Sequence, residues 1–128
     1  MKHRILIIDD DEGVRFTLKR ALEGRGDIDV RCANDGKEGL LSLEAERADL
    51  VITDIIMPDK EGIETIMEIK HLYPSTSIIA ISGGGSIASR DLLTMARDLG
   101  ASYVITKPFL IDELLSTVDL GLGVERAQ

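Results

Sequence analysis

Acidic, hydroxyl and lysine side chains directly follow four short apolar runs of the sequence. In chain order these polar residues are Asp9-Asp10-Asp11-Glu12, Thr53-Asp54, Ser82 and Thr106-Lys107. Crowded carboxylates repel one another unless a cation joins them, and their oxygens suit Mg²⁺. A carboxylate beside such a metal could attack a phosphoryl group, while a hydroxyl and an ammonium bind its oxygens. If the four positions meet in the folded chain, they suit phosphoryl transfer to a carboxylate.

The apolar runs have the composition of strands that are buried on both faces. They are rich in β-branched residues and occupy residues 5–8, 50–52, 78–81 and 104–105. Residues 28–32 alternate between apolar and polar side chains, which is typical of a half-exposed edge strand. The sequence therefore predicts five strands.

Apolar residues at helical spacing lie between these runs. They predict helices around residues 14–22, 40–45, 66–72, 92–99 and 112–118. Asp11 or Glu12 is expected to cap the first helix and Asp112 the last, and Gly100 is expected to end the fourth. Single helices between strands predict an α/β fold, (βα)5, with helices on both faces of a parallel sheet. Ligands bind such sheets at the carboxyl ends of the strands, so the four polar positions should converge there.

Length and composition describe one small acidic domain. Its 128 residues fit a single core, for which about 100–200 residues are usual. A formal net charge of −8 argues against duplex nucleic acid or anionic lipid as the main partner. Cys32 has no second cysteine with which to form a disulfide, and no apolar stretch reaches the length of a signal peptide or a membrane span. We therefore expect a cytoplasmic domain that does not contact a membrane.

Five blocks of the sequence resemble the receiver domain of two-component response regulators. They extend over about residues 4–120 and are Ile7-Ile8-Asp9-Asp10, Asp54-Ile-Ile-Met-Pro-Asp-Lys-Glu-Gly62, Ala80-Ile81-Ser82, Leu99-Gly100-Ala101 and Lys107-Pro108-Phe109. The resemblance implies a flavodoxin-like, doubly wound parallel sheet of five strands in the order 2-1-3-4-5. It also implies a receiver domain over residues 1–121, followed by a short tail or the start of a linker over residues 122–128.

The resemblance assigns the phosphoacceptor and the metal ligands. Asp54 would accept the phosphoryl group. Asp10 would bind Mg²⁺ directly, together with Asp54 and the backbone carbonyl of Ile56, and Mn²⁺ could take its place. Asp9 would act mainly through a water bound to the metal.

Ser82 and Lys107 complete the implied site. Ser82 stands at the switch-hydroxyl position, where Thr is the commoner residue, and Lys107 would bridge toward the phosphoryl group. A cis bond between Lys107 and Pro108 is expected, since only an X-Pro bond adopts that isomer at low cost. Many receivers carry an inward-turning aromatic residue three positions before the lysine. Here that residue is Val104, and strand alternation should point Tyr103 to the opposite face.

The implied function is a signalling switch controlled by phosphorylation. A histidine kinase or a histidine phosphotransfer protein would phosphorylate Asp54. The surface formed by the fourth helix, fifth strand and fifth helix would then change its preference for a downstream protein target or a missing output domain. The domain would not be an enzyme, because it turns over no metabolite, and would not bind nucleic acid directly. Arg15, Lys19 and Arg20 on the outer side of the first helix would meet the kinase, although most such charged faces are only solvated.

Two other functions fit single parts of the sequence. A phosphorylation-independent interaction module would retain only the fold, but degenerate receivers typically lose an acid or the lysine, and this chain keeps them. A flavin- or nucleotide-binding domain would cradle phosphate with the glycines at 83–85. No Walker-type lysine follows those glycines, and few aromatic residues could stack on a ring.

Two dynamic expectations concern residues beside the site. The glycines at 83–85 should leave the loop over residues 83–90 mobile until phosphorylation orders it. Ile56 is apolar where a polar residue could position an attacking water, so dephosphorylation should be slow to moderate.

Overall fold

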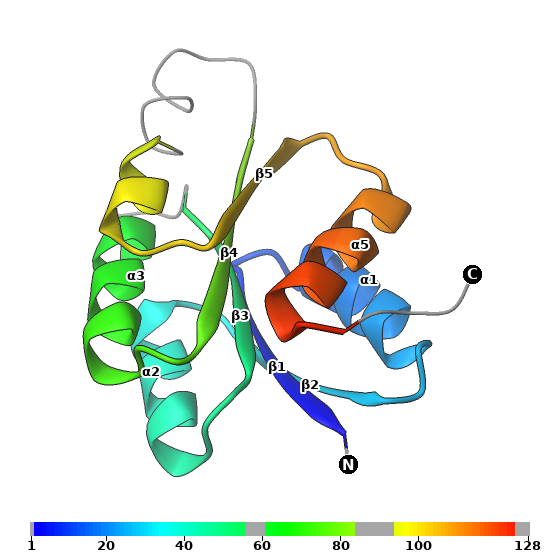
Figure 1. Cartoon of the computed structure of the whole chain (residues 1–128), viewed down its shortest axis with the longest axis horizontal. Coiled ribbons are helices and arrows are strands. Elements are labelled where there is room, and N and C mark those ends of the chain that lie inside the picture. The colour runs from blue at the N-terminus through cyan, green and yellow to red at the C-terminus, as the bar shows by residue number, and fades with distance from the viewer. Residues whose placement is uncertain (1, 56–60, 84–93, 125–128) are drawn as a thin grey trace.

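A parallel sheet of five strands forms the centre of the molecule (Figure 1). The computed structural model describes residues 2–55, 61–83 and 94–124. The strands are β1 (His3–Ile8), β2 (Ile28–Ala33), β3 (Leu50–Asp54), β4 (Ser77–Gly83) and β5 (Tyr103–Lys107). Their order is β2-β1-β3-β4-β5, and every neighbouring pair is parallel. The predicted flavodoxin-like order 2-1-3-4-5 is confirmed.

Helices cover both faces of the sheet. They are α1 (Glu12–Glu23), α2 (Gly36–Ala45), α3 (Glu61–Leu72) and α5 (Ile111–Leu122), with a further helical segment at residues 94–99. Figure 1 shows α1 and α5 on one face and α2, α3 and the 94–99 segment on the other. The doubly wound (βα)5 arrangement is thus confirmed. Within the described residues, no helix combines the length and the hydrophobicity that crossing a membrane requires.

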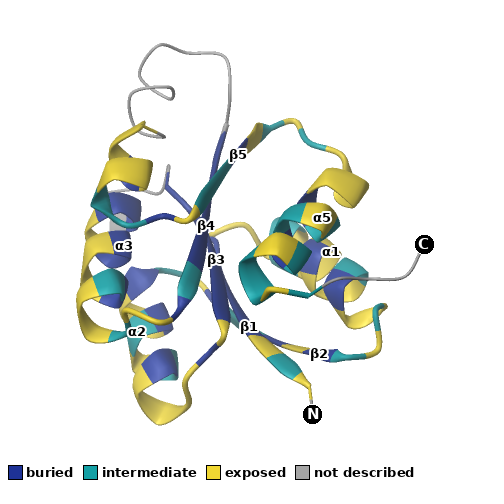
Figure 2. Cartoon of the chain, viewed as in Figure 1, coloured by how far each residue is buried: buried dark blue, intermediate teal, exposed yellow. Residues whose placement is uncertain are grey.

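The core consists of two layers, one on each face of the sheet (Figure 2). Side chains of β1 alternate between them: Ile5 and Ile7 pack with residues of α1 and α5, whereas Leu6 and Ile8 pack with residues of α2 and α3. Each fully buried aliphatic side chain of this kind contributes about 1.5–3 kcal/mol. All residues of β3 are buried, as its continuous apolar run predicts.

Of the three predicted helix-end residues, Asp11 and Gly100 are confirmed and Asp112 is not. Asp11 is the N-cap of α1, and its side chain accepts a hydrogen bond from the Val14 backbone nitrogen. Gly100, with φ at +137°, follows the helical residues 94–99 as expected. The prediction that Asp112 caps α5 is wrong, because the N-cap is Leu110, which makes no capping side-chain hydrogen bond. Asp112 lies in the first turn instead, where its negative charge interacts favourably with the positive end of the helix dipole.

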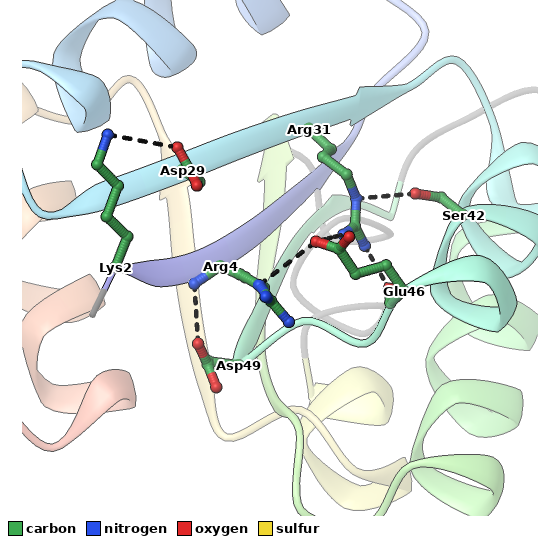
Figure 3. Close-up of polar contacts among 7 residues, drawn as sticks. All are labelled: Lys2, Arg4, Asp29, Arg31, Ser42, Glu46 and Asp49. Atoms are coloured by element: carbon green, nitrogen blue, oxygen red, sulfur yellow. Dashed lines mark hydrogen bonds and ion pairs between the residues drawn. The ribbon is translucent and has the colours of Figure 1, made fainter.

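Polar contacts fasten the edge strand β2 to the end of α2 (Figure 3). Arg31 of β2 donates to the Ser42 hydroxyl at 3.1 Å and to the Glu46 carbonyl at 2.6 Å. The Glu46 Oε1 forms ion pairs with the Arg31 Nη1 at 3.0 Å and with the Nε of Arg4 in β1 at 3.3 Å. Since Glu46 is the C-cap of α2, one arginine satisfies a helix-terminal carbonyl and holds the sheet edge in place.

Gly62, in the first turn of α3, lies against the end of β3. A Cβ at this position would stand 2.5 Å from the Ile55 Cα and 2.9 Å from the Asp54 carbonyl oxygen. Backbone atoms at a buried strand end cannot move aside as a flexible side chain can. The glycine that ends the Asp54–Gly62 motif therefore allows α3 to pack directly on the strand end that carries Asp54.

Replacing Gly62 should loosen this packing. We expect Gly62→Ala to lower the free energy of unfolding by about 1–2 kcal/mol, because overpacking outweighs the gain of about 1 kcal/mol in helix propensity. Urea denaturation followed by circular dichroism measures the change. Gly13→Ala in α1 is the control, since its nearest obstacle is the Asp11 carboxylate at 3.2 Å. Unchanged or increased stability of Gly62→Ala would show that the close approach is not limiting.

Candidate functional site

The carboxyl ends of the strands bring Asp54 and Lys107 into direct contact. Asp54 ends β3 and Lys107 ends β5, and the Lys107 Nζ lies 3.1 Å from the Asp54 Oδ2. The Asp54 side chain is 8% exposed and that of Lys107 is 32% exposed. The ammonium therefore reaches a nearly buried carboxylate from the more open side. Such a charge-assisted contact compensates for the cost of burying the carboxylate.

Asp9 supplies a second buried carboxylate directly after β1. It is 3% exposed, and its Oδ1 accepts a hydrogen bond from the Asp11 backbone nitrogen at 2.8 Å. Burial raises the pKa of Asp9, and the charges of Asp54 and Asp10 add to this effect. The Asp11 hydrogen bond and the Lys107 charge lower the pKa but do not cancel the rise. Further positive charge near Asp9 would therefore stabilise this end of the sheet.

The acidic residues offer hard oxygen donors to a cation. Asp10 follows Asp9 and is exposed. Over residues 2–55, 61–83 and 94–124, no group of three His, Cys, Asp or Glu forms a ready-made metal site. Mg²⁺ needs only one or two carboxylates, because it retains several waters. Asp9, whose charge interacts with those of Asp54 and Asp10, lies among carboxylate oxygens of the kind that a hydrated Mg²⁺ would bind. The predicted carbonyl ligand of Ile56 lies outside the described residues.

Ser82 lies at the same end of the sheet, one strand away from Asp54. It is fully buried in β4, next to Ile81, which is the register partner of Asp54. On its other side Ser82 pairs with Thr106, the residue before Lys107. The predicted hydroxyl is therefore carried by the strand between the acid and the lysine. Residues 84–90 of the loop that follows, which was expected to order on phosphorylation, are outside the described residues.

The strand β5 presents its residues as the alternation predicts. Val104 packs with the core layer of α2 and α3, whereas Tyr103 packs with the layer of α1 and α5. The position three residues before Lys107 thus carries no aromatic ring, and the Tyr103 ring lies on the opposite face. The expected cis bond between Lys107 and Pro108 is present.

Arg15 is a residue of the site that the sequence pattern did not reveal. Its Nη1 donates a hydrogen bond to the Asp9 backbone carbonyl at 2.7 Å. The prediction that Arg15 faces outward with Lys19 and Arg20 is wrong, because Arg15 is half-buried while the other two are exposed. A long arginine side chain can turn back over one helical turn to a backbone carbonyl that precedes the helix. The closeness of Arg15 to the acidic residues 9–12 in the sequence was the signal that could have indicated this contact.

The sequence is similar to those of known response regulators. The family model described as the response regulator receiver domain matches residues 5–119. The response regulator MprA of Mycolicibacterium vanbaalenii is 34% identical over 116 residues, which are 91% of this chain and 48% of that protein. MprA of Mycobacterium tuberculosis is 33% identical over 116 residues, covering 91% of this chain and 49% of that protein. The chain thus spans about half the length of the curated relatives it matches.

Solved structures agree with this relationship. A CheY-like receiver domain from Methanospirillum hungatei has a TM-score of 0.86 at 32% identity, covering 96% of this chain and 95% of that one. Chemotaxis protein CheY4 of Vibrio cholerae has a TM-score of 0.84 at 27% identity, with coverages of 95% and 100%. NtrX of Brucella abortus has a TM-score of 0.86 at 28% identity, covering 96% of this chain but 27% of that one. The fold, the sequence match over residues 5–119 and the agreement with these structures lead to one conclusion: the chain belongs to the response regulator receiver domain family of two-component systems.

Proposed function

We propose that this receiver domain accepts a phosphoryl group on Asp54 from a histidine kinase or a histidine phosphotransfer protein. The contact of 3.1 Å between Lys107 and Asp54, beside the buried Asp9, carries the proposal. A phosphorylation-independent module would have no need of two buried carboxylates and a lysine at one edge of the sheet. Within this proposal the domain acts in the cytoplasm as a switch and turns over no metabolite. Its net charge of −8 opposes direct contact with nucleic acid or an anionic membrane.

The residues of the site divide the work of the transfer. An Asp54 carboxylate oxygen forms the new bond to phosphorus as the bond from phosphorus to the donor imidazole nitrogen breaks, which gives an acyl phosphate. The Lys107 ammonium then pairs with a phosphoryl oxygen, and the Ser82 hydroxyl donates to another. Asp10, Asp54 and the Ile56 carbonyl would hold Mg²⁺, or Mn²⁺, with Asp9 acting through water. The metal, when bound, neutralises phosphoryl oxygens.

The switch would act through the surface of residues 94–99, β5 and α5. The partner is a downstream protein or an output domain. The curated relatives are about twice as long as this chain, whereas the matched chain of Vibrio cholerae CheY4 is covered to 100%, so both kinds of partner occur among similar proteins. We accordingly place the receiver domain at residues 1–121 and the tail or the start of a linker at residues 122–128.

Phosphorylation should depend on Asp54. With acetyl phosphate and Mg²⁺, the unmodified chain should gain a hydroxylamine-labile phosphoryl group, detected by intact mass, and Asp54→Asn should gain none. Lys107→Met should acquire it roughly tenfold more slowly, because one preorganised positive charge is lost. Asp112→Asn, an exposed acid of α5, serves as the control and should react normally. Equal labelling of Asp54→Asn would refute the proposal.

Asp9 should make the metal-free protein less stable. The raised pKa means that the folded state favours protonated Asp9, so this contribution to stability is present at low pH and is lost as the pH rises through the folded pKa. At neutral pH in EDTA, Asp9→Asn should therefore raise the melting temperature by about 2–5 °C. Added Mg²⁺ should stabilise the unmodified chain more than the variant, since it binds only the folded state. A lower melting temperature for Asp9→Asn in EDTA would contradict this electrostatic account.

Arg15 should support the reaction by positioning the Asp9 segment. Arg15→Met removes the donor to the Asp9 carbonyl and should slow phosphorylation by acetyl phosphate by roughly tenfold, with weaker binding of Mg²⁺. Arg15→Lys should recover part of the rate. Arg20→Met, an exposed arginine on the same helix, controls for the loss of a positive charge. If both methionine variants react alike, the hydrogen bond has no positioning role.

A further inference from the structure

A groove between α2 and α3 exposes apolar side chains away from the phosphorylation site. It has a volume of about 550 Å³, and its apolar lining consists of Leu40, Leu41, Leu72 and Tyr73. Leu41 is 59% exposed and Leu72 is 50% exposed, although both are large aliphatic residues. Contiguous exposed apolar surface of this kind marks an interaction site more often than isolated exposed residues do.

Close packing of the two helices makes this groove a preformed feature. Gly36, in the first turn of α2, lies so near α3 that a Cβ there would overlap the Thr65 hydroxyl. Both residues are buried and also line the groove. A partner would therefore meet a surface that needs little reordering, which lowers the entropic cost of binding.

The charged residues that line the groove favour a positively charged partner. Glu44, Glu64 and Glu68 line it together with Lys37, so these four residues carry three negative charges and one positive charge. The three glutamates are exposed and can accept partner cations. At one end, the chain's own Arg47 guanidinium lies 5.7 Å from the centre of the Tyr73 ring, so a cation from the partner is expected beside the glutamates and not at Tyr73.

These features disfavour other occupants. A second copy of the chain would bring its own net charge of −8 to an acidic groove, and an anionic lipid surface would also be repelled. A groove between two helices with an apolar floor suits an amphipathic helix, whose apolar side chains recur at positions i, i+3, i+4 and i+7. Lysine or arginine on the flanks of such a helix would pair with the glutamates.

We propose that the α2–α3 groove docks a cationic amphipathic helix of a partner protein. Apolar side chains of that helix pack on Leu41 and Leu72, and its cations lie beside Glu64 and Glu68. The residues that line the groove include neither Asp54 nor Lys107 and belong neither to α1 nor to α5. The domain would thus hold a partner independently of its phosphorylation.

Binding of a designed probe tests this proposal. A fluorescein-labelled helical peptide of about 18 residues, with a leucine face and lysine flanks, should bind the unmodified chain in fluorescence anisotropy. Leu41→Ser and Leu72→Ser should each weaken binding by about tenfold, since a large apolar contact is lost. Leu120→Ser is the matched control, because Leu120 on α5 is 64% exposed. Asp54→Asn should bind as the unmodified chain does, which separates this test from that of phosphorylation.

A matched pair of charge variants tests the acidic rim. Glu64→Gln with Glu68→Gln should weaken the lysine peptide several-fold. Glu23→Gln with Glu113→Gln changes the net charge equally on α1 and α5 and should not weaken it. Equal effects of the two double variants, or of Leu120→Ser and Leu41→Ser, would overturn the proposal in favour of nonspecific attraction. Equal binding of a peptide with glutamate in place of lysine would also overturn it. A third outcome would also overturn the proposal. If sedimentation shows that the free chain self-associates and that Leu41→Ser abolishes this self-association, the groove binds a second copy of the chain.

Discussion

The contact between the Lys107 ammonium and the Asp54 carboxylate is the interaction around which this domain is organised. The two residues are 53 positions apart in the sequence and meet because β3 and β5 flank β4 in one parallel sheet. A nearly buried carboxylate is costly unless a cation lies beside it. The strand order, with β4 between the strands of the acid and the lysine, places these two charges together, and Gly62 lets α3 pack closely on the strand end that carries Asp54. The resulting site is compact, and its position depends on the whole sheet.

Negative charge exceeds positive charge around Asp9, close to this contact. Asp9 is buried beside Asp54 and Asp10, and Lys107 offsets only part of their mutual repulsion. Arg15 holds the backbone at Asp9 and leaves the carboxylate itself to other partners. The net charge of −8 is therefore less informative as a global property than as a local one. A site with excess negative charge is stabilised by a cation, and under the proposed function this local imbalance would couple metal binding to the state of Asp54.

The strands, the helices and the strand ends that carry polar residues could be predicted from the sequence, because they depend on local patterns. The strand order 2-1-3-4-5 was expected only from the resemblance to receiver domains. The apolar runs mark strands buried on both faces, and acids that follow such runs must lie at the carboxyl edge of a parallel sheet. The sequence does not distinguish an N-cap from a first-turn position for Asp112, because an acidic residue stabilises a helix start in both places, and the structure has it in the first turn. The close approach of Gly62 required the packed backbone of β3, although the motif had already singled out the glycine.

The sequence by itself determined the alternation of strands and helices, the strand ends at which the polar residues stand, and the opposite faces of Tyr103 and Val104. These follow from periodicities of two and 3.6 residues, which depend only on the backbone. Tertiary structure alone decided that Arg15 turns inward, that burial raises the pKa of Asp9, and that α2 and α3 leave an acidic apolar groove. A long side chain takes whichever partner the fold brings within its reach. Burial, likewise, is a sum over neighbours that are distant in the sequence.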